Sequence, residues 1–264
     1  MKRRWRRILW TLGIVVVVSF VYAWFFGFQT MMILETRWIA RKSPIVRETP
    51  RALPDTSISP AHGTKLSYFG YDFEVPWDDL DLAQSKTQSN PVVLRFRSGR
   101  SLMFSSSPPR HFVDAVSKEM GQLDGFRGIY GDAPLQSDYA FWSMILAATP
   151  DQVNLFSSRK EIVGNSMLLV MKGVALPQRS GIFRVQTQGF KGFQWGDPKA
   201  DPTHVVADLF ADDCGLEFVF FGKSKKNPES ISQAEINRVL QTVHKTEHIP
   251  SQAASRPKLV ANAE

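Results

Sequence analysis

The most hydrophobic stretch of the chain is an uncharged run of 21 residues, Ile8 to Phe28. As a helix it would be about 31 Å long, which matches the hydrocarbon core of a bilayer at about 30 Å. Five basic residues precede the run and none follows it directly: Lys2, Arg3, Arg4, Arg6 and Arg7. The positive-inside rule then predicts a cytoplasmic N-terminus and an extracytoplasmic main domain. A cleaved signal peptide is the alternative, but it would need small residues where Trp24 and Phe25 stand.

The next residues change from a helical pattern to one without periodicity. Met31, Leu34 and Trp38 recur at helical spacing among basic residues, which predicts that the helix continues for about two turns along the membrane surface. Residues 43–62 contain four prolines and no aromatic residue, so they predict a semi-extended linker.

Alternating patterns predict the strands of a folded domain. Hydrophobic residues occupy every second position from Phe69 to Val75. Residues 92–97 and 101–105 flank a short Ser-Gly connection and predict a hairpin. Further strands are expected at 181–188, 193–195, 203–210 and 216–221. The last two would form a second hairpin around residues 211–215, with Phe210 opposite Leu216.

Helices are expected between and after these strands. Apolar residues at helical spacing predict helices over 109–120 and 139–146, the second beginning at Ser137. Serine and glutamate three positions apart form capping boxes at Ser158 and Ser232, which predict helices extending to about residues 170 and 243.

Together these patterns predict an α+β protein: an N-terminal transmembrane helix, then one domain with a largely antiparallel sheet packed by helices. The expected segments are a basic cytoplasmic end (1–7), a membrane helix (8–28), a juxtamembrane segment with linker (29–62), a soluble domain (63–248) and a disordered tail (249–264).

Two stretches resemble the Mog1/PsbP-like α/β/α sandwich. The first is Phe73-Glu74-Val75-Pro76-Trp77, similar to an early strand that ends at a Pro and a Trp. The second is the pair of closing strands with a C-terminal helix over residues 203–246. The resemblance implies a binding or assembly module, because domains of this group are mostly accessory.

Charge and cysteine content narrow the classes of function. The net charge of +7 lies at the ends of the chain, because residues 1–28 carry +5, 29–62 carry +2 and 249–264 carry +1. Residues 63–248 are left with −1, so no nucleic acid is expected as a partner. Cys214 is the single cysteine, so an extracytoplasmic domain would depend on core burial and not on a disulfide.

Two motifs could indicate an envelope hydrolase. His244 and His248 with Glu247 fit H-x-x-E-H, in which two histidines one helical turn apart bind zinc. The third ligand that a catalytic zinc needs has no suitable candidate. Ser157 and Lys160 fit S-x-x-K, although the companion motifs of penicillin-binding enzymes are missing. No catalytic residue, metal or cofactor is therefore assigned.

A glycine-rich aromatic stretch is the remaining candidate for recognition. Phe190, Phe193 and Trp195 stand among three glycines, a composition suited to a binding loop, although core-facing aromatics in a hairpin would look the same.

The sequence thus favours a membrane-anchored, extracytoplasmic binding or assembly module over an enzyme, with the bilayer and an envelope protein as partners. An envelope hydrolase is the first alternative. A lipid- or small-molecule-binding domain with an aromatic-lined pocket is the second.

Overall fold

A seven-stranded sheet forms the middle layer of the structure, a computed structural model that describes residues 26–60, 63–120, 123–176, 181–201, 203–222 and 230–246. Its strand order is β1-β6-β7-β8-β9-β5-β4, and only the β1–β6 pair is parallel. The strands are β1 Arg51–Ala52, β4 Val92–Arg95, β5 Ser101–Ser107, β6 Ile182–Thr187, β7 Phe190–Trp195, β8 His204–Ala211 and β9 Cys214–Phe221.

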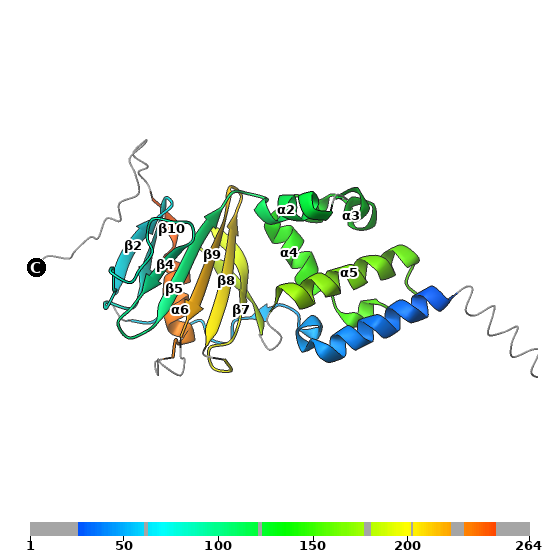
Figure 1. The fold of residues 1–264 in the computed structure, drawn as a ribbon, viewed down its shortest axis with the longest axis horizontal. Helices are drawn as coiled ribbons and strands as arrows, with labels where there is room; N and C mark the ends of the chain where they lie inside the picture. Colours follow the sequence, from blue (N-terminus) through cyan, green and yellow to red (C-terminus); the bar gives the residue numbers. More distant parts are fainter. Residues whose placement is uncertain are drawn as a thin grey trace, which may run out of the picture.

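A small sheet and one helix cover the first face of the large sheet (Figure 1). The small sheet has the order β10-β3-β2 and is formed by β2 Thr64–Tyr68, β3 Tyr71–Val75 and β10 His244–Lys245. The helix is α6, Gln233–Thr242, which packs on β3. Aromatic side chains such as Phe73, Phe104 and Phe218 meet between the two sheets, with ring centroids 4.8–5.4 Å apart.

A layer of helices packs against the second face of the sheet and extends away from it (Figure 1). It contains a helix over residues 26–42, α2 His111–Met120, α3 Leu123–Tyr130, α4 Asp138–Ala147 and α5 Arg159–Ala175, with short 3-10 turns η1 Pro44–Arg47, η2 Ala133–Leu135 and η3 Pro150–Gln152. The α+β class and the helix starts at Ser137, Ser158 and Ser232 are confirmed, since each serine side chain accepts a bond from the first turn of its helix.

The second hairpin has a different register from the predicted one. Phe210 pairs with Gly215 and Leu209 with Leu216, so the strands are shifted by one residue. The reason is a tighter turn: Asp212 and Asp213 alone reverse the chain, and Cys214 already belongs to β9 with its side chain buried.

Strand β2 was not expected from the sequence. The residues that connect it to β3, Phe69 and Gly70, both have positive φ angles of 55° and 80°, as a tight hairpin turn of the primed type requires. The alternation that begins at Phe69 therefore starts in the turn, and the strand itself begins at Tyr71.

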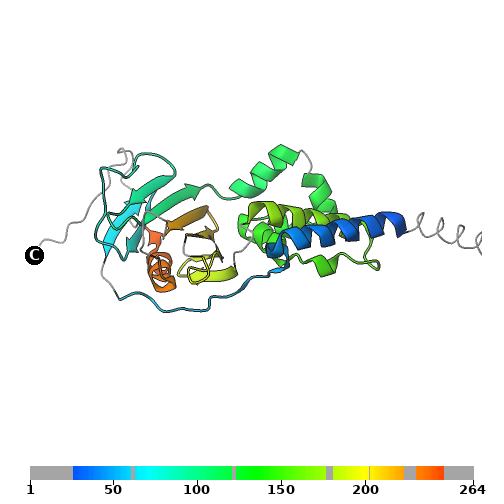
Figure 2. The same cartoon turned by 60° about the horizontal axis from the view of Figure 1, so that its bottom comes forward.

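Residues 43–60, predicted to be a linker, run along the domain as the 3-10 turn η1 followed by a mostly extended chain (Figure 2). Ile45 and Val46 are buried in the helical core, and β1 pairs with β6. Asn237 on α6 then donates hydrogen bonds to the carbonyls of Asp55 and Ser57. We call residues 43–60 the strap, because they tie the helical layer to the far side of the sheet.

The helix over residues 26–42 continues further than the predicted two turns, and a different face is buried. Met32, Ile33, Ile39 and Ala40 pack into the helical core. Met31, Leu34 and Trp38, predicted to lie on a membrane surface, are the exposed face. Contact with a bilayer through these three side chains stays a prediction.

The predicted membrane helix lies mostly outside the described residues, because the structure describes only positions 26–28 of the run 8–28. Within the described part of the chain, no helix combines the length and the apolar character that a membrane crossing requires. The predicted tail, 249–264, also lies outside the described residues.

A buried lysine joins the strap to two helices. Lys172 on α5 is 0% exposed, and its Nζ donates to four carbonyl oxygens: Leu146 and Ala148 at the end of α4 at 2.8 Å each, Glu48 at 2.5 Å and Val46 at 3.4 Å. Removal from water lowers the pKa of this ammonium group to about 8, partly offset by the Glu48 charge. The carbonyls at two helix ends are the compensation for burying it.

Replacing Lys172 by Met should destabilise the protein, because four buried carbonyls would lose their donor. We expect a loss of about 2–4 kcal/mol in the free energy of unfolding. Urea titrations monitored by circular dichroism would measure it, with the exposed Lys118→Met as the matched control. Equal stability of the two variants would show that Lys172 contributes no more than a surface lysine.

Candidate functional site

The most chemically distinctive hollow lies where the helical layer meets the sheet, and we call it the carboxylate pocket. It has a volume of about 660 Å³. Strands β5, β7, β8 and β9 form its floor, and α2 and α4 form its wall. Three acidic residues line it: Asp138, Asp208 and Glu217.

Aromatic rings form the apolar side of the carboxylate pocket. Phe112 stacks on Trp142 at a centroid distance of 4.7 Å, and Trp142 lies 5.5 Å from Trp195 on the sheet. Phe210 also lines the hollow. These rings come from α2, α4, β7 and β8, so the wall exists only when the helices are docked on the sheet.

Asp208 and Glu217 lie directly opposite each other on β8 and β9. Residues opposite one another in an antiparallel pair have Cβ atoms about 4.5–5.5 Å apart, so the two acids share one site. Ser105 on β5 donates its hydroxyl to Glu217 at 3.2 Å. Asp208 Oδ1, in contrast, is buried and has no hydrogen-bond partner, although the residue as a whole is half-buried.

The environment of Asp208 disfavours its charged form. Burial raises the pKa of this carboxyl well above its ordinary value, and the negative charges of Glu217 and Asp138 raise it further. Both effects favour the protonated form of Asp208 over the ionised form.

Asp138 has a structural role in the same wall. Its Oδ1 accepts a hydrogen bond from Val113 N at 2.9 Å and its Oδ2 one from Phe112 N at 3.2 Å. These are free amides in the first turn of α2, so a carboxylate at the start of α4 caps the neighbouring helix. The contact fixes Phe112 beside Trp142.

The charge of the carboxylate pocket is one-sided. The described residues that line it include no Lys or Arg. Lys191 lies beside the pocket on the same face of β7, opposite Phe210, with its Nζ near the Tyr139 ring. A metal centre is not indicated, since the described residues contain no cluster of three or more His, Cys, Asp or Glu able to hold an ion. The lining of the pocket therefore combines carboxylates, which accept hydrogen bonds, with aromatic rings.

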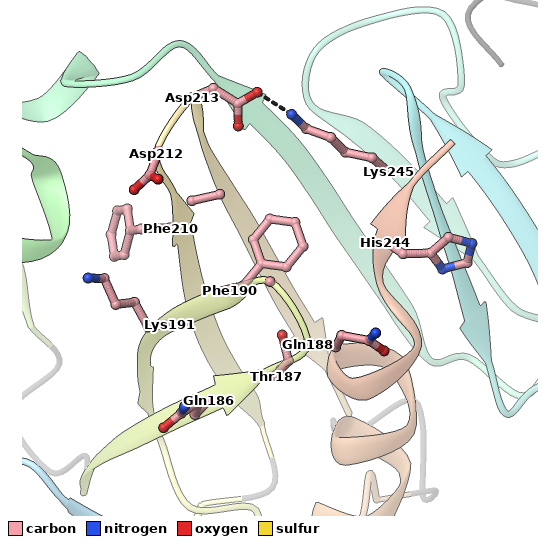
Figure 3. A pocket seen from close by; sticks show the side chains of 12 residues that line it. Gln186, Thr187, Gln188, Phe190, Lys191, Phe210, Asp212, Asp213, His244 and Lys245 are labelled. Atoms are coloured by element: carbon pink, nitrogen blue, oxygen red, sulfur yellow. Dashed lines mark hydrogen bonds and ion pairs between the residues drawn. The ribbon is translucent and has the colours of Figure 1, made fainter. Parts of the chain in front are cut away.

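A second hollow, of about 580 Å³, lies at the turn ends of the two hairpins β6–β7 and β8–β9 (Figure 3). Lys245 from β10 and Asp213 form an ion pair across one side of it, and Lys191 lies on another side. Lys191 Nζ also sits 4.6 Å from the ring centroid of Tyr139. Its charged side chains are exposed and of both signs, so the hollow does not favour one class of ligand.

The aromatic residues proposed as a recognition loop are buried. Phe190, Phe193 and Trp195 are 7%, 1% and 7% exposed. They form β7, with Phe190 facing the core shared with the small sheet and the other two facing the helices. These side chains therefore match the core-facing alternative and do not project from the surface, although Trp195 does reach the carboxylate pocket.

The hydrolase motifs do not assemble a site in the described residues. His244 lies in β10 and not on a helix, because α6 ends at Thr242, and His248 lies outside the described residues. Ser157 donates its hydroxyl to the carbonyl of Gln152 at 3.2 Å, while Lys160 is exposed on α5. Burial raises the pKa of the Cys214 thiol, so it is not an activated thiolate.

Sequence reasoning missed Asp208 and Glu217. A signal was present, since each acid interrupts a strand of otherwise apolar residues and lies on the same face as buried neighbours such as Phe210 and Val219. The predicted register would have placed Asp208 opposite Phe218, so the pairing of the two acids was hidden.

Comparison with known proteins gives no relative: no protein-family model, no curated protein and no solved structure matches this chain. The similarity to the Mog1/PsbP-like sandwich stays a resemblance of two short stretches.

Replacing Asp208 by Asn should stabilise the protein at neutral pH. The folded state of the native protein keeps a proton on Asp208 where the unfolded chain has lost it, so native stability falls as pH rises above the ordinary Asp pKa of about 3.9. An asparagine does not titrate, so the variant does not lose stability in this way. We expect its free energy of unfolding to be higher by about 1–3 kcal/mol, with Tm higher by about 2–4 °C for each kcal/mol.

Thermal unfolding of both proteins between acidic and neutral pH would measure this effect. The gain should vanish below the ordinary Asp pKa. Asp212→Asn, an exposed acid in the turn of the same hairpin, is the matched control. A destabilised Asp208→Asn variant at neutral pH would contradict the assignment.

Proposed function

We propose that this chain is a membrane-anchored, extracytoplasmic binding module whose carboxylate pocket receives a positively charged organic group. The observation that carries the proposal is Asp208, a buried acceptor without a partner, placed opposite a second carboxylate under aromatic walls. Buried polar groups are almost always hydrogen-bonded, so an unpartnered carboxylate in a hollow indicates a missing donor.

The charge and shape of the pocket favour an ammonium or guanidinium group over other ligands. An anion would meet three carboxylates and no described Lys or Arg. A neutral ligand could bond to protonated Asp208 and donate to Glu217, but it would lack the attraction of opposite charges. A cation gains charge-assisted hydrogen bonds from both carboxylates, beside an aromatic wall that excludes water.

Protonation couples this binding to pH. A cation displaces the proton from Asp208, so affinity should increase as pH rises through the range between the ordinary and the raised pKa of this group. The charged or titratable groups around Asp208 are Glu217 on β9, Asp138 on α4 and His111 on α2, with Lys191 diagonal to it on the same face of β7.

The anchor is the second part of the proposal. It is supported by the uncharged run 8–28, its one-sided basic flank, and the entry of the chain at the end of the helical layer furthest from the sheet (Figure 1). A protein held in this way displays its pocket outside the membrane.

A hydrolase that uses the pocket carboxylates is the second candidate. The observation that favours it is the raised pKa of Asp208 beside Glu217, because a protonated and an ionised carboxyl group can act as general acid and base. Binding alone requires fewer assumptions, because it requires no attacking group.

Three probes with the same ring test the proposed ligand class: benzylamine, benzyl alcohol and phenylacetate. With the full chain in lipid nanodiscs, we expect benzylamine to bind best in saturation-transfer NMR titrations at neutral pH. Asp208→Asn should weaken benzylamine by about 10- to 100-fold, because a charge-assisted bond is worth about 1.5–3 kcal/mol.

The matched control is Asp212→Asn, which removes an acid from the second hollow and should leave benzylamine binding unchanged. Equal binding of benzyl alcohol, or full affinity in Asp208→Asn, would refute a cation site in the carboxylate pocket.

The orientation has its own test. In spheroplasts of an expressing bacterium, protease added outside should digest residues 63–248, because the basic flank retains the N-terminus in the cytoplasm. A domain that survives until the cells are lysed would reverse the proposed topology.

A further inference from the structure

One aromatic side chain is presented to solvent at the outer end of the helical layer. Phe156 exposes 99% of its surface, and its neighbour Leu155 exposes 43%. A fully exposed phenylalanine carries a free-energy cost in water that burial would remove. Such residues, when grouped and rimmed by charge, mark interaction surfaces.

The loop that carries Phe156 is held firmly by its own hydrogen bonds. Asn154 Oδ1 accepts from Phe156 N at 3.0 Å, and Ser157 donates to Gln152 O at 3.2 Å. The capping box of Ser158 and Glu161 then fixes the start of α5. Phe156 is therefore exposed on a turn whose flanking residues are held by hydrogen bonds.

This turn lies where the apolar run enters the fold. The helix over residues 26–42 and α5 run side by side in the same direction, since Arg159 Cζ lies 6.0 Å from the ring centroid of Phe28 and Thr36 bonds Ser166 at 3.2 Å. Phe28 is the last residue of the run 8–28. Phe156, three residues before Arg159, is thus at the level where the proposed membrane helix would leave the bilayer.

The charges beside the turn suit phospholipid headgroups. Arg159 and Lys160 follow Phe156 by three and four residues and are exposed. Glu161 is engaged in the capping box, which leaves the two cations to face outward. An apolar tip with basic residues one turn above it is the pattern of side chains that insert into the interfacial region of a bilayer.

We propose that Leu155 and Phe156 insert into the phospholipid surface next to residues 8–28, with Arg159 and Lys160 at the level of the phosphates. This inference rests on the proposed membrane anchor and not on the ligand of the pocket. Two attachment points fix the tilt of the module, so its sheet and carboxylate pocket point away from the bilayer.

Fluorescence quenching in nanodiscs tests the inference. The full chain carries Cys214→Ala and one new cysteine, Phe156→Cys or Val174→Cys, labelled with an environment-sensitive dye. Val174 is the matched control: it is 83% exposed on the same helix, about 22 Å along the axis from Arg159. Spin-labelled phospholipids in phosphatidylcholine–phosphatidylglycerol discs should quench the dye at position 156 several-fold more than at position 174.

The outcomes separate the two proposals. If the chain stays in the discs but the two dyes are quenched equally weakly, the inserted loop is wrong and the anchor stands. If the chain does not stay in the discs, the anchor fails and the inserted loop with it. Strong quenching at position 156 alone supports both.

Discussion

The buried ammonium group of Lys172 is the interaction on which the helical layer depends. From its position on α5 it donates hydrogen bonds to carbonyl oxygens at the end of α4 and in the strap. A charge in this position is costly unless every donor is used, and here it meets four acceptors. The consequence is geometric: α4 and the strap cannot move independently of α5.

That constraint supports both proposed surfaces. The start of α4 carries Asp138, which caps α2, and its next turn carries Trp142, which faces Trp195 across the carboxylate pocket. The start of α5 carries the turn with Phe156 at the opposite end of the layer. A rigid helical layer would therefore keep a fixed separation between a membrane-facing tip and a ligand pocket.

Asp208 is the residue of the pocket that lowers the stability of the fold. Its Oδ1 is buried beside two other acids and lacks a hydrogen-bond partner, which reduces stability at neutral pH. Groups of this kind are typical of functional sites, where stability is given up for a prepared interaction. The arrangement is explained if a cation supplies the absent partner.

Much of the fold could be predicted from the sequence, because local patterns determine it. Capping boxes located the starts of α5 and α6, and apolar stretches that flank short turns located β4, β5, β8 and β9. The register of β8 on β9 could not be read in this way, since it depends on a two-residue turn, and an error of one residue separated Asp208 from Glu217. Likewise Lys172 looks like a surface residue in the sequence, and only the carbonyls brought by distant segments make its burial tolerable.

The most direct test of this account is the number of protons released when benzylamine binds. Calorimetric titrations of the full chain in nanodiscs, at about pH 6 in two buffers of different ionisation enthalpy, would give that number. The account predicts a release of up to about one proton per ligand, lost in Asp208→Asn. Binding without proton release, or with the same release in the variant, would contradict it.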